Sequence, residues 1–263
     1  NEELFGHAFR RGGALEGARK AQSEGLVKHV GFSTHAHPDI ILKTIETREF
    51  ESVNLHYYLF NRRNAEAVSR AAELDMGVLI ISPTEKGGML MEPPETLSKL
   101  SEPLSPLELN YRFCLSNPAV TTMTVGAALP EHFEPHLKAV ENTGPLSEAE
   151  NAVLSGIELQ YRKLGAAYCS VCGKCMPCPQ GIEIPAVLRL RNLAAAFDMM
   201  EFAKYRYNLF EGGGHWFPGV KADKCNKCGD CLPRCPLKLD IPGLLLETHD
   251  MLSGKAQKRL WSM

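Results

Sequence analysis

Apolar residues follow two alternating spacings along the first 141 residues. Short apolar runs of strand length, several of them β-branched, lie at 29–33, 51–58, 77–83 and 119–127. Segments of helical spacing lie at 13–25, 38–50, 62–76, 107–116 and 130–141. A Gly- and Pro-rich stretch at 84–106 predicts a loop. Strands that alternate with amphipathic helices are typical of βαβ units, so the pattern predicts an α/β fold with a parallel sheet.

The pattern changes after residue 141. Residues 143–165 have helical spacing, and Ser147 with Glu150 forms the signature of a capping box at the start. The chain then becomes rich in cysteine, proline and glycine, apart from a helical stretch at 184–210. We therefore expect three parts: a first unit at 1–141, a connecting helix at 142–168 and a C-terminal domain at 169–263.

Composition limits the class of protein. The chain has 263 residues, of which 44% are hydrophobic, and this is enough for a packed core. Its formal net charge of −2 indicates no bulk basic surface, so nucleic acid is not expected as a main partner. No apolar run approaches the roughly 18–20 residues that span a bilayer, and the start of the chain has no secretory signal. We expect a cytoplasmic protein with no membrane span.

Eight of the nine cysteines lie in two groups after residue 168. The first group reads C-x2-C-x2-C-x2-C-P and consists of Cys169, Cys172, Cys175 and Cys178. The second reads C-x2-C-x2-C-x3-C-P and consists of Cys225, Cys228, Cys231 and Cys235. CPQGIEIP at 178–185 matches CPLKLDIP at 235–242, so the domain contains an internal repeat. A secreted disulfide scaffold would be short and would spread its cysteines, so the spacing indicates metal-binding thiols. The ninth cysteine, Cys114, is predicted to pack as a small apolar residue.

The cysteine spacing favours two [4Fe–4S] clusters, with zinc as the alternative. Structural zinc takes four ligands, usually two from each of two C-x2-C pairs, and three successive C-x2-C steps exceed that need. In two-cluster ferredoxins, the fourth cysteine of each run binds the cluster of the other run. By this rule, one cluster is held by Cys169, Cys172, Cys175 and Cys235. The other is held by Cys225, Cys228, Cys231 and Cys178. The helical stretch between the motifs predicts a mainly helical domain of ferredoxin type.

Five stretches of the chain together carry a family resemblance. They are LEGARKAQSEGLVKHVGFSTH, VNLHYYLFNRR, LIISPTEKGGML, LSNPAVTTMTVGAALPEHFEPHL and the cysteine motif YCSVCGKCMPCPQGIEIP. They resemble motifs of the aldo/keto reductase family, in the branch that carries a C-terminal iron–sulfur domain. The counterparts are a strand ending in Gly-Val-Ser-Asn, a Val-Gln-x-x-Tyr-Asn-Leu segment, a Ser-Pro-Leu-x-x-Gly loop, the final strand with its loop, and the cluster motif. The resemblance implies the C-terminal half of a TIM-type (β/α)8 barrel, followed by a small two-cluster domain.

The resemblance also implies an NADP(H) site at the carboxyl ends of the strands, where barrel enzymes carry their chemistry. Ser33 and Thr34 would meet the nicotinamide carboxamide, with Asn54 in the place of a family glutamine. Tyr57 would stack on the nicotinamide ring. The pyrophosphate would be approached by Ser82, Gly87 and Gly126. From the residues alone, Ser33 and Thr34 also fit a helix cap, and Tyr57 also fits a core position.

No catalytic residue is expected in this chain. The family's catalytic aspartate, tyrosine, lysine and histidine lie on strands in the first half of the barrel, which the resemblance places ahead of Asn1. Four βα units make half of an eight-stranded barrel and would leave two open sheet edges. We therefore expect about 100 or more further residues ahead of Asn1 in the parent protein.

Three functions fit these features. The first is NADP(H)-linked reduction of a small-molecule carbonyl substrate by an oxidoreductase of aldo/keto reductase type with an attached electron-transfer module. The second is a ferredoxin-like electron-transfer subunit whose barrel half is a docking scaffold, with a redox partner protein. In the third, the clusters are structural. Nicotinamide gives up a two-electron hydride and a cubane accepts one electron, so coupling them needs a flavin or similar group, and we find no flavin motif.

Overall fold

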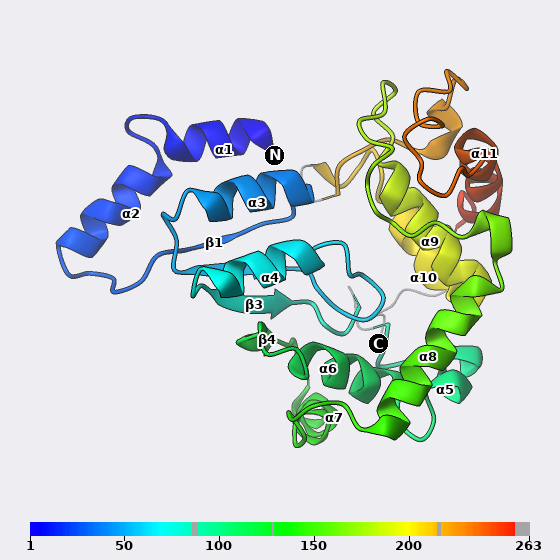
Figure 1. Ribbon diagram of the computed structural model, residues 1–263, viewed down its shortest axis with the longest axis horizontal. Helices are drawn as coiled ribbons and strands as arrows, with labels where there is room; N and C mark the ends of the chain where they lie inside the picture. The colour runs from blue at the N-terminus through cyan, green and yellow to red at the C-terminus, as the bar shows by residue number, and fades with distance from the viewer. Residues whose placement is uncertain (86–88, 128, 215–216, 256–263) are drawn as a thin grey trace. The chain divides into compact units, whose positions relative to one another are not determined.

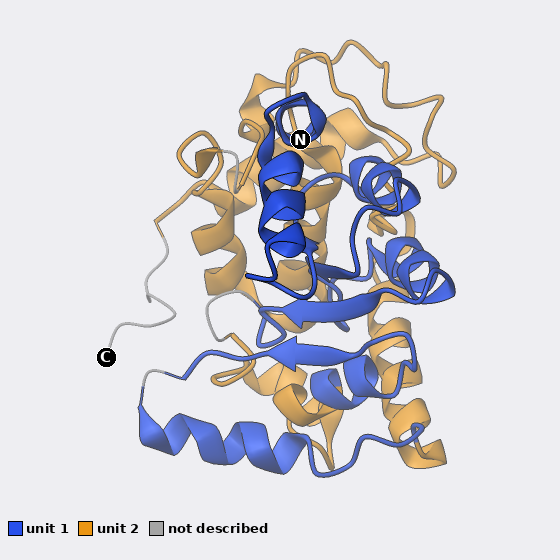
Figure 2. Cartoon of the chain, turned by 90° about the vertical axis from the view of Figure 1, so that its left-hand side faces the viewer, with its two compact units in different colours: residues 1–86, 110–146 blue, residues 87–109, 147–263 orange. Residues whose placement is uncertain are grey.

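A computed structural model describes residues 1–85, 89–127, 129–214 and 217–255 of the chain (Figure 1). The chain divides into two compact units, coloured separately in Figure 2. The first unit comprises Asn1–Lys86 and Asn110–Leu146, and the second comprises Gly87–Leu109 and Ser147–Met263. Among the helices of these described ranges, none combines the length and the apolar character needed to cross a membrane.

A four-stranded parallel sheet in the order β1-β2-β3-β4 forms the centre of the first unit. Its strands are β1 (Gly31–Ser33), β2 (Ser52–Leu55), β3 (Gly77–Ile81) and β4 (Thr122–Thr124). Each strand lies within a segment that the apolar pattern predicted. The expectation of an α/β unit with a parallel sheet is therefore confirmed.

Helices alternate with these strands along the chain (Figure 1). They are α1 (Glu2–Phe9), α2 (Ala14–Ser23), α3 (Pro38–Glu46), α4 (Ala65–Glu73), α6 (Pro106–Leu115) and α7 (Phe133–Ala139), the last preceded by the 3₁₀ helix η1 (Pro130–His132). Pro38 begins α3, where its fixed φ suits the helix and its missing amide costs no hydrogen bond. Helix α1 was not predicted from the sequence.

The core of the first unit lies between the sheet and the helices α3 and α4. Alternate strand residues face it and are fully buried: Val53, Leu55, Val78 and Ile80. They pack with Ile41 and Ile45 of α3 and with Ala67 and Val68 of α4. The intervening strand positions, such as Asn54 and Leu79, are only partly buried. One face of the sheet therefore carries the core, and the other face is less covered.

Two buried side chains of α6 complete this unit. Cys114 is 0% exposed within the core, as predicted, and burial raises the pKa of its thiol well above the ordinary value. Arg112 is 3% exposed, and its guanidinium donates to the main-chain oxygens of Asn142 (2.6 Å), Gly144 (2.9 Å) and Pro145 (2.9 Å). These bonds fix the path of the chain just before it enters the second unit.

The second unit is mainly helical, as expected. Its helices are α5 (Glu95–Ser101), α8 (Glu148–Arg162), α9 (Ile184–Phe197), α10 (Met200–Tyr207) and α11 (Ile241–Leu252), with the 3₁₀ helices η2 (Gly165–Ala167) and η4 (Ala222–Lys224). The capping box at the start of α8 is present: Glu150 N–H donates to Ser147 Oγ (3.2 Å), and Ser147 N–H donates to Glu150 Oε2 (2.7 Å).

Two details of this unit differ from the sequence-based expectation. The stretch at 84–106 was expected to be a loop, yet it contains α5, which buries Leu97 completely. The helical stretch at 184–210 is divided into α9 and α10, because Asp198 takes a left-handed conformation (φ 57°) at the end of α9. A left-handed residue ends the α-helical hydrogen-bond pattern.

Candidate metal centre and strand-end site

Two copies of one backbone path carry the eight clustered cysteines. Each copy begins with a 3₁₀ helix, η2 or η4, and leads into a helix that starts with Ile-Pro, α9 or α11. The backbone takes positive φ at matching positions of the two copies: Val171 and Lys227 (57° and 59°), Gly173 and Gly229 (77° and 86°), Gly181 and Lys238 (73° and 51°). The sequence repeat is therefore also a structural repeat.

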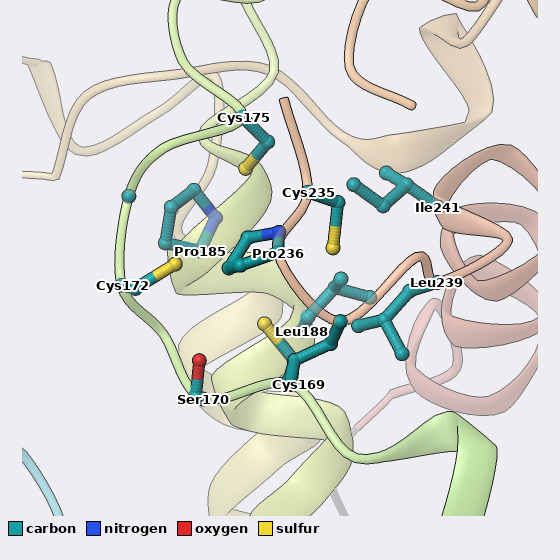
Figure 3. Close-up of a pocket in the computed structure, with 12 residues that line it drawn as sticks. Cys169, Ser170, Cys172, Cys175, Pro185, Leu188, Cys235, Pro236, Leu239 and Ile241 are labelled. Atoms are coloured by element: carbon teal, nitrogen blue, oxygen red, sulfur yellow. The ribbon is translucent and has the colours of Figure 1, made fainter. Parts of the chain in front are cut away.

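One pocket of the second unit brings four of these cysteines together. Three come from the first motif, Cys169, Cys172 and Cys175, and one comes from the second, Cys235. Figure 3 shows their sulfur atoms turned toward the same space. The remaining lining is mainly apolar: Pro185, Leu188, Pro236, Leu237, Leu239 and Ile241, with Ser170 and Gly173. This pocket joins the two cysteine motifs.

The other four cysteines form a second group around Cys231. Burial is the main cause that raises the pKa of the Cys231 thiol, and the nearby thiols of Cys225, Cys228 and Cys178 raise it further. Cys178 belongs to the first motif by sequence and thus lies among the first three cysteines of the second. The Cys175 thiol interacts electrostatically with that of Cys231, so the two groups are neighbours.

Without a metal ion, burial keeps two of these thiols protonated. It raises the pKa of Cys169 to about 11 and that of Cys175 to about 12. A thiol must lose its proton to bind metal, and the positive charge of iron favours that loss. The Cys169 sulfur already accepts a hydrogen bond from the Val171 amide (3.4 Å), which also favours the thiolate.

The arrangement is compatible with a cubane. Within the described ranges, no group of three or more His, Cys, Asp or Glu side chains is close enough to hold one metal ion. In a cubane each thiolate binds a different iron, so its four ligands need not converge on one point. Four thiols around an apolar pocket are the donor set that such a cluster requires.

Two polar side chains that the sequence analysis did not single out hold the cysteine loops. Asn192 of α9 is 2% exposed, donates from Nδ2 to the Cys169 oxygen (2.7 Å) and accepts at Oδ1 from the Cys169 amide (3.5 Å). Arg234 donates to the main-chain oxygens of Met176 (2.7 Å), Pro177 (3.0 Å) and Asp230 (2.8 Å). Both had a sequence signal. Asn192 lies in an apolar helical run, and Arg234 is the residue that lengthens the last spacer of the second motif.

The strand-end residues implied by the resemblance lie in different surroundings. Ser33 is exposed and pairs in register with Asn54 across β1 and β2. The Thr34 amide donates to the Asn54 oxygen (3.0 Å), and Thr34 Oγ1 accepts from the Ala36 amide (3.0 Å). The Oδ1 atom of Asn54 is buried and has no hydrogen-bond partner in the described structure. An unpaired buried carbonyl of this kind is free to accept a hydrogen bond from a ligand.

The remaining residues of that set differ in burial and in backbone conformation. Ser82 follows β3 with a left-handed backbone (φ 59°), and Gly126 is exposed beyond the end of β4. Tyr57 is 8% exposed within the hydrophobic core, where its ring lies 5.4 Å from that of Phe113. Its hydroxyl accepts from Asn117 Nδ2 (3.3 Å). Gly87 lies outside the residues that the structure describes.

Buried asparagines hold the loops that follow β2 and β3. Asn110 is 0% exposed; its Oδ1 accepts from the Leu59 amide (2.8 Å), and its Nδ2 donates to the Pro83 oxygen. Asn64 donates from Nδ2 to the His56 oxygen (2.8 Å). These bonds fix the loops at the carboxyl edge of the sheet, which is the edge where a ligand site is expected in a parallel α/β fold.

Comparison with known proteins gives a family match, and among the similar solved structures are two forms of one aldo-keto reductase. Residues 168–240 match the 4Fe-4S dicluster domain family, so the prediction of an iron–sulfur domain is confirmed. The aldo-keto reductase AKR11C1 from Bacillus halodurans is similar in its holo form at 25% identity over 54% of each chain (TM-score 0.46). Its apo form is similar at 23% identity over 54% of each chain (TM-score 0.47). The chain thus spans about half the length of these structures. None of the curated proteins matches it.

Proposed function

We propose that this chain is the C-terminal part of an oxidoreductase of aldo/keto reductase type that carries two [4Fe–4S] clusters. The observation that carries the proposal is the pocket that joins Cys235 to Cys169, Cys172 and Cys175. The fourth cysteine of one motif thereby meets the first three of the other, which is the ligand arrangement of two-cluster ferredoxins. The match to the dicluster domain at 168–240 supports it independently.

The proposed ligand sets are the two groups of thiols. Cys169, Cys172, Cys175 and Cys235 would hold the first cluster. Cys225, Cys228, Cys231 and Cys178 would hold the second. Each bound cluster supplies one-electron transfer. The pocket excludes water because its lining includes the buried side chains of Leu188, Leu239 and Ile241. The cysteine loops are held in place by Asn192 and Arg234.

The nucleotide site belongs to the same proposal and rests on the family motifs and on the strand-end polar groups. Parallel βα units place Ser33, Thr34, Asn54 and Ser82 at the carboxyl ends of β1, β2 and β3. The unpaired Oδ1 of Asn54 is a candidate partner for the carboxamide of NADP(H). Tyr57 is 8% exposed and offers little ring surface to a ligand where it lies. Carbonyl reduction would also require catalytic residues from outside this chain.

Metal analysis tests the cluster proposal. Protein purified without oxygen should be brown and contain on the order of eight irons and eight sulfides per chain. Reduction with dithionite should bleach the visible absorption and give electron paramagnetic resonance signals of reduced cubanes. Zinc in place of iron, with colourless protein, would contradict the proposal.

Nucleotide titration tests the proposed NADP(H) site. NADPH fluorescence should report binding to a protein that includes the complete barrel, and Asn54→Leu should weaken it by about 5- to 30-fold, because one hydrogen bond of about 1–2 kcal/mol is lost. Asn151→Ala, on the exposed surface of α8, is the matched control and should leave binding unchanged. Equal binding by the wild-type protein and by Asn54→Leu would exclude Asn54 from the site. No binding at all would favour the scaffold function for the sheet unit.

A further inference from the structure

Asn192 binds the first cysteine of the pocket through both polar atoms of its side chain. Its Nδ2 donates to the Cys169 oxygen (2.7 Å), and its Oδ1 accepts from the Cys169 amide (3.5 Å). Asn192 is 2% exposed and Cys169 is 9% exposed, so both hydrogen bonds lie in the interior. A buried hydrogen bond is costly to lose, because its partner is left unpaired. The side chain of Asn192 therefore fixes the orientation of the Cys169 backbone.

The backbone that follows Cys169 is strained. Val171 has a left-handed conformation (φ 57°), which crowds a β-branched side chain. A residue persists in such a conformation only where its surroundings hold it there. The two hydrogen bonds between Asn192 and Cys169 fix the chain just ahead of Val171 and so supply part of this restraint.

The strained turn places a backbone donor on a ligand sulfur. The Val171 amide donates to Cys169 Sγ (3.4 Å). Burial raises the pKa of the Cys169 thiol and the Val171 amide lowers it, so this donor stabilises negative charge on the sulfur. An electron added to a bound cluster increases the negative charge on its thiolate ligands. Hydrogen bonds to those sulfurs therefore favour the reduced state and raise the reduction potential.

The second copy of the repeat uses the same helix position differently. Asn192 and His249 occupy matching positions of α9 and α11, counted from the Ile-Pro pair that begins each helix. His249 Nδ1 contacts the Tyr207 hydroxyl (2.8 Å), and that hydroxyl accepts from the Ala222 amide (2.8 Å). Ala222 lies in η4, ahead of the ligand cysteines. Asn192 thus holds a ligand residue itself, whereas its counterpart holds the chain before the ligands.

We propose that Asn192 is a positioning residue that raises the reduction potential of the first cluster. By holding the Cys169 backbone, it keeps the turn at Val171 left-handed and the Val171 amide on the Cys169 sulfur. The proposal rests on the proposed function, because it requires a cluster in the pocket. In the reduction step an external reductant loses one electron and the oxidised cluster gains it, and no bond forms or breaks. One substitution at Asn192 should therefore change the first cluster and leave the second unchanged.

The test is a reductive titration of the whole chain with dithionite, followed by electron paramagnetic resonance. Iron and sulfide are measured first for every variant. A wild-type chain without iron would contradict the proposed function, and the role of Asn192 would fall with it. With iron bound, each cluster should take up one electron. The two reduction steps are assigned with Cys169→Ala and Cys225→Ala, each of which should keep one cluster.

Asn192→Ala should make the first cluster harder to reduce. At a fixed applied potential, its ratio of reduced to oxidised cluster should fall about tenfold, which corresponds to about 59 mV for one electron. The reduction step of the second cluster should not move. Val171→Gly allows the left-handed backbone without strain. In that background, Asn192→Ala should shift the first step about half as much or less, because the turn no longer depends on Asn192.

Two control variants separate this role from a general loss of packing. Leu193→Ala removes a fully buried side chain next to Asn192 on α9, and it should lower stability while leaving both reduction steps unchanged. His249→Ala changes the matching position of α11 and should leave the first step unchanged. Asn192→Ser leaves room for a water molecule to pair with the Cys169 backbone. It serves if Asn192→Ala does not fold, and it should shift the first step in the same direction.

Three results would overturn the proposal. The first is a variant of Asn192 that keeps its iron and shows both reduction steps unchanged. The second is an equal shift of the first step in Leu193→Ala, or an equal shift of both steps in Asn192→Ala, since either would reflect loosened packing. The third is loss of the first cluster from both Asn192→Ala and Asn192→Ser, which would make Asn192 a residue that only retains the cluster.

Discussion

The guanidinium of Arg234 donates from Nη1 to the main-chain oxygen of Met176 at 2.7 Å and so ties the second cysteine motif to the first. The same side chain reaches the oxygens of Pro177 and Asp230. Arg234 precedes Cys235, whose thiol lies in the pocket with three cysteines of the first motif. One arginine therefore holds together the two loops that share this pocket.

Arg234→Ala should destabilise the second unit and weaken binding of the first cluster. Three charge-assisted hydrogen bonds are lost, and because the side chain is partly exposed we expect a cost of about 1–3 kcal/mol in the free energy of unfolding. Iron should be lost about tenfold faster to a chelator. Arg234→Lys keeps the charge but not the forked geometry and should recover only part of the stability. Lys238→Ala, a nearby exposed cation, should retain iron normally; equal retention by Arg234→Ala would contradict the role given to Arg234.

The crossed ligand sets predict which single cysteine variants resemble one another. Cys235→Ala and Cys169→Ala should leave the same residual spectrum, because both remove a ligand of the first cluster. Cys178→Ala and Cys225→Ala should share the other residual spectrum. Each variant should keep about half of the roughly eight irons, whereas Cys114→Ala should keep all of them.

The comparison is made by electron paramagnetic resonance and iron analysis of the reduced proteins. If Cys235→Ala instead resembles Cys225→Ala, each cysteine run holds its own cluster and the crossing is wrong.

Tyr207 should make the stability of the second unit depend on alkaline pH. Its hydroxyl accepts from the Ala222 amide (2.8 Å) and contacts His249 Nδ1 (2.8 Å), and burial raises its pKa to about 12. Because the unfolded pKa is about 10, the neutral phenol stabilises the fold fully below pH 10, and this contribution is lost as pH rises toward 12. The loss should reach about 2–3 kcal/mol.

The matched variant is Tyr207→Phe, compared with the partly exposed Tyr205→Phe. Urea unfolding between pH 7 and pH 12 should show a shallower alkaline decline for Tyr207→Phe, together with a loss of about 1–2 kcal/mol at pH 7 from the unpaired Ala222 amide. An alkaline decline as steep as that of the wild-type protein would exclude Tyr207 as its source.

Tyr57 should behave as a core residue of the first unit. Tyr57→Ala removes a ring that packs with Phe113 and should cost about 3–5 kcal/mol in the free energy of unfolding. Tyr57→Phe removes only the hydroxyl that Asn117 contacts, and should cost about 1 kcal/mol or less. Urea denaturation of the two variants tests this. A stable Tyr57→Ala protein that fails to bind NADPH would restore the stacking role.

The repeating local patterns of the sequence determined much of this protein. Short apolar runs were enough to place the four strands, because strand positions that pack on the core are apolar. In β2 and β3 these positions are fully buried, and in β1 and β4 they are the partly buried Phe32 and Met123. Ser147 and Glu150 specified the start of α8, since a capping box involves only residues three apart. The two cysteine runs specified an iron–sulfur domain, because the number of residues between successive cysteines determines whether their thiolates can bind one cluster.

Tertiary structure decided what depends on residues far apart in the chain. The stretch at 84–106 has weak helical propensity on account of its Pro and Gly residues, yet α5 forms there and buries Leu97. Nothing local to Arg234 indicates that it reaches Met176, 58 residues away in the chain. Whether Tyr57 faces a ligand or the core depends on Phe113 and Asn117, which follow it by more than fifty positions. Local spacing specifies secondary structure and ligand sets, whereas the partner of a side chain is set by packing between segments that only the folded chain brings together.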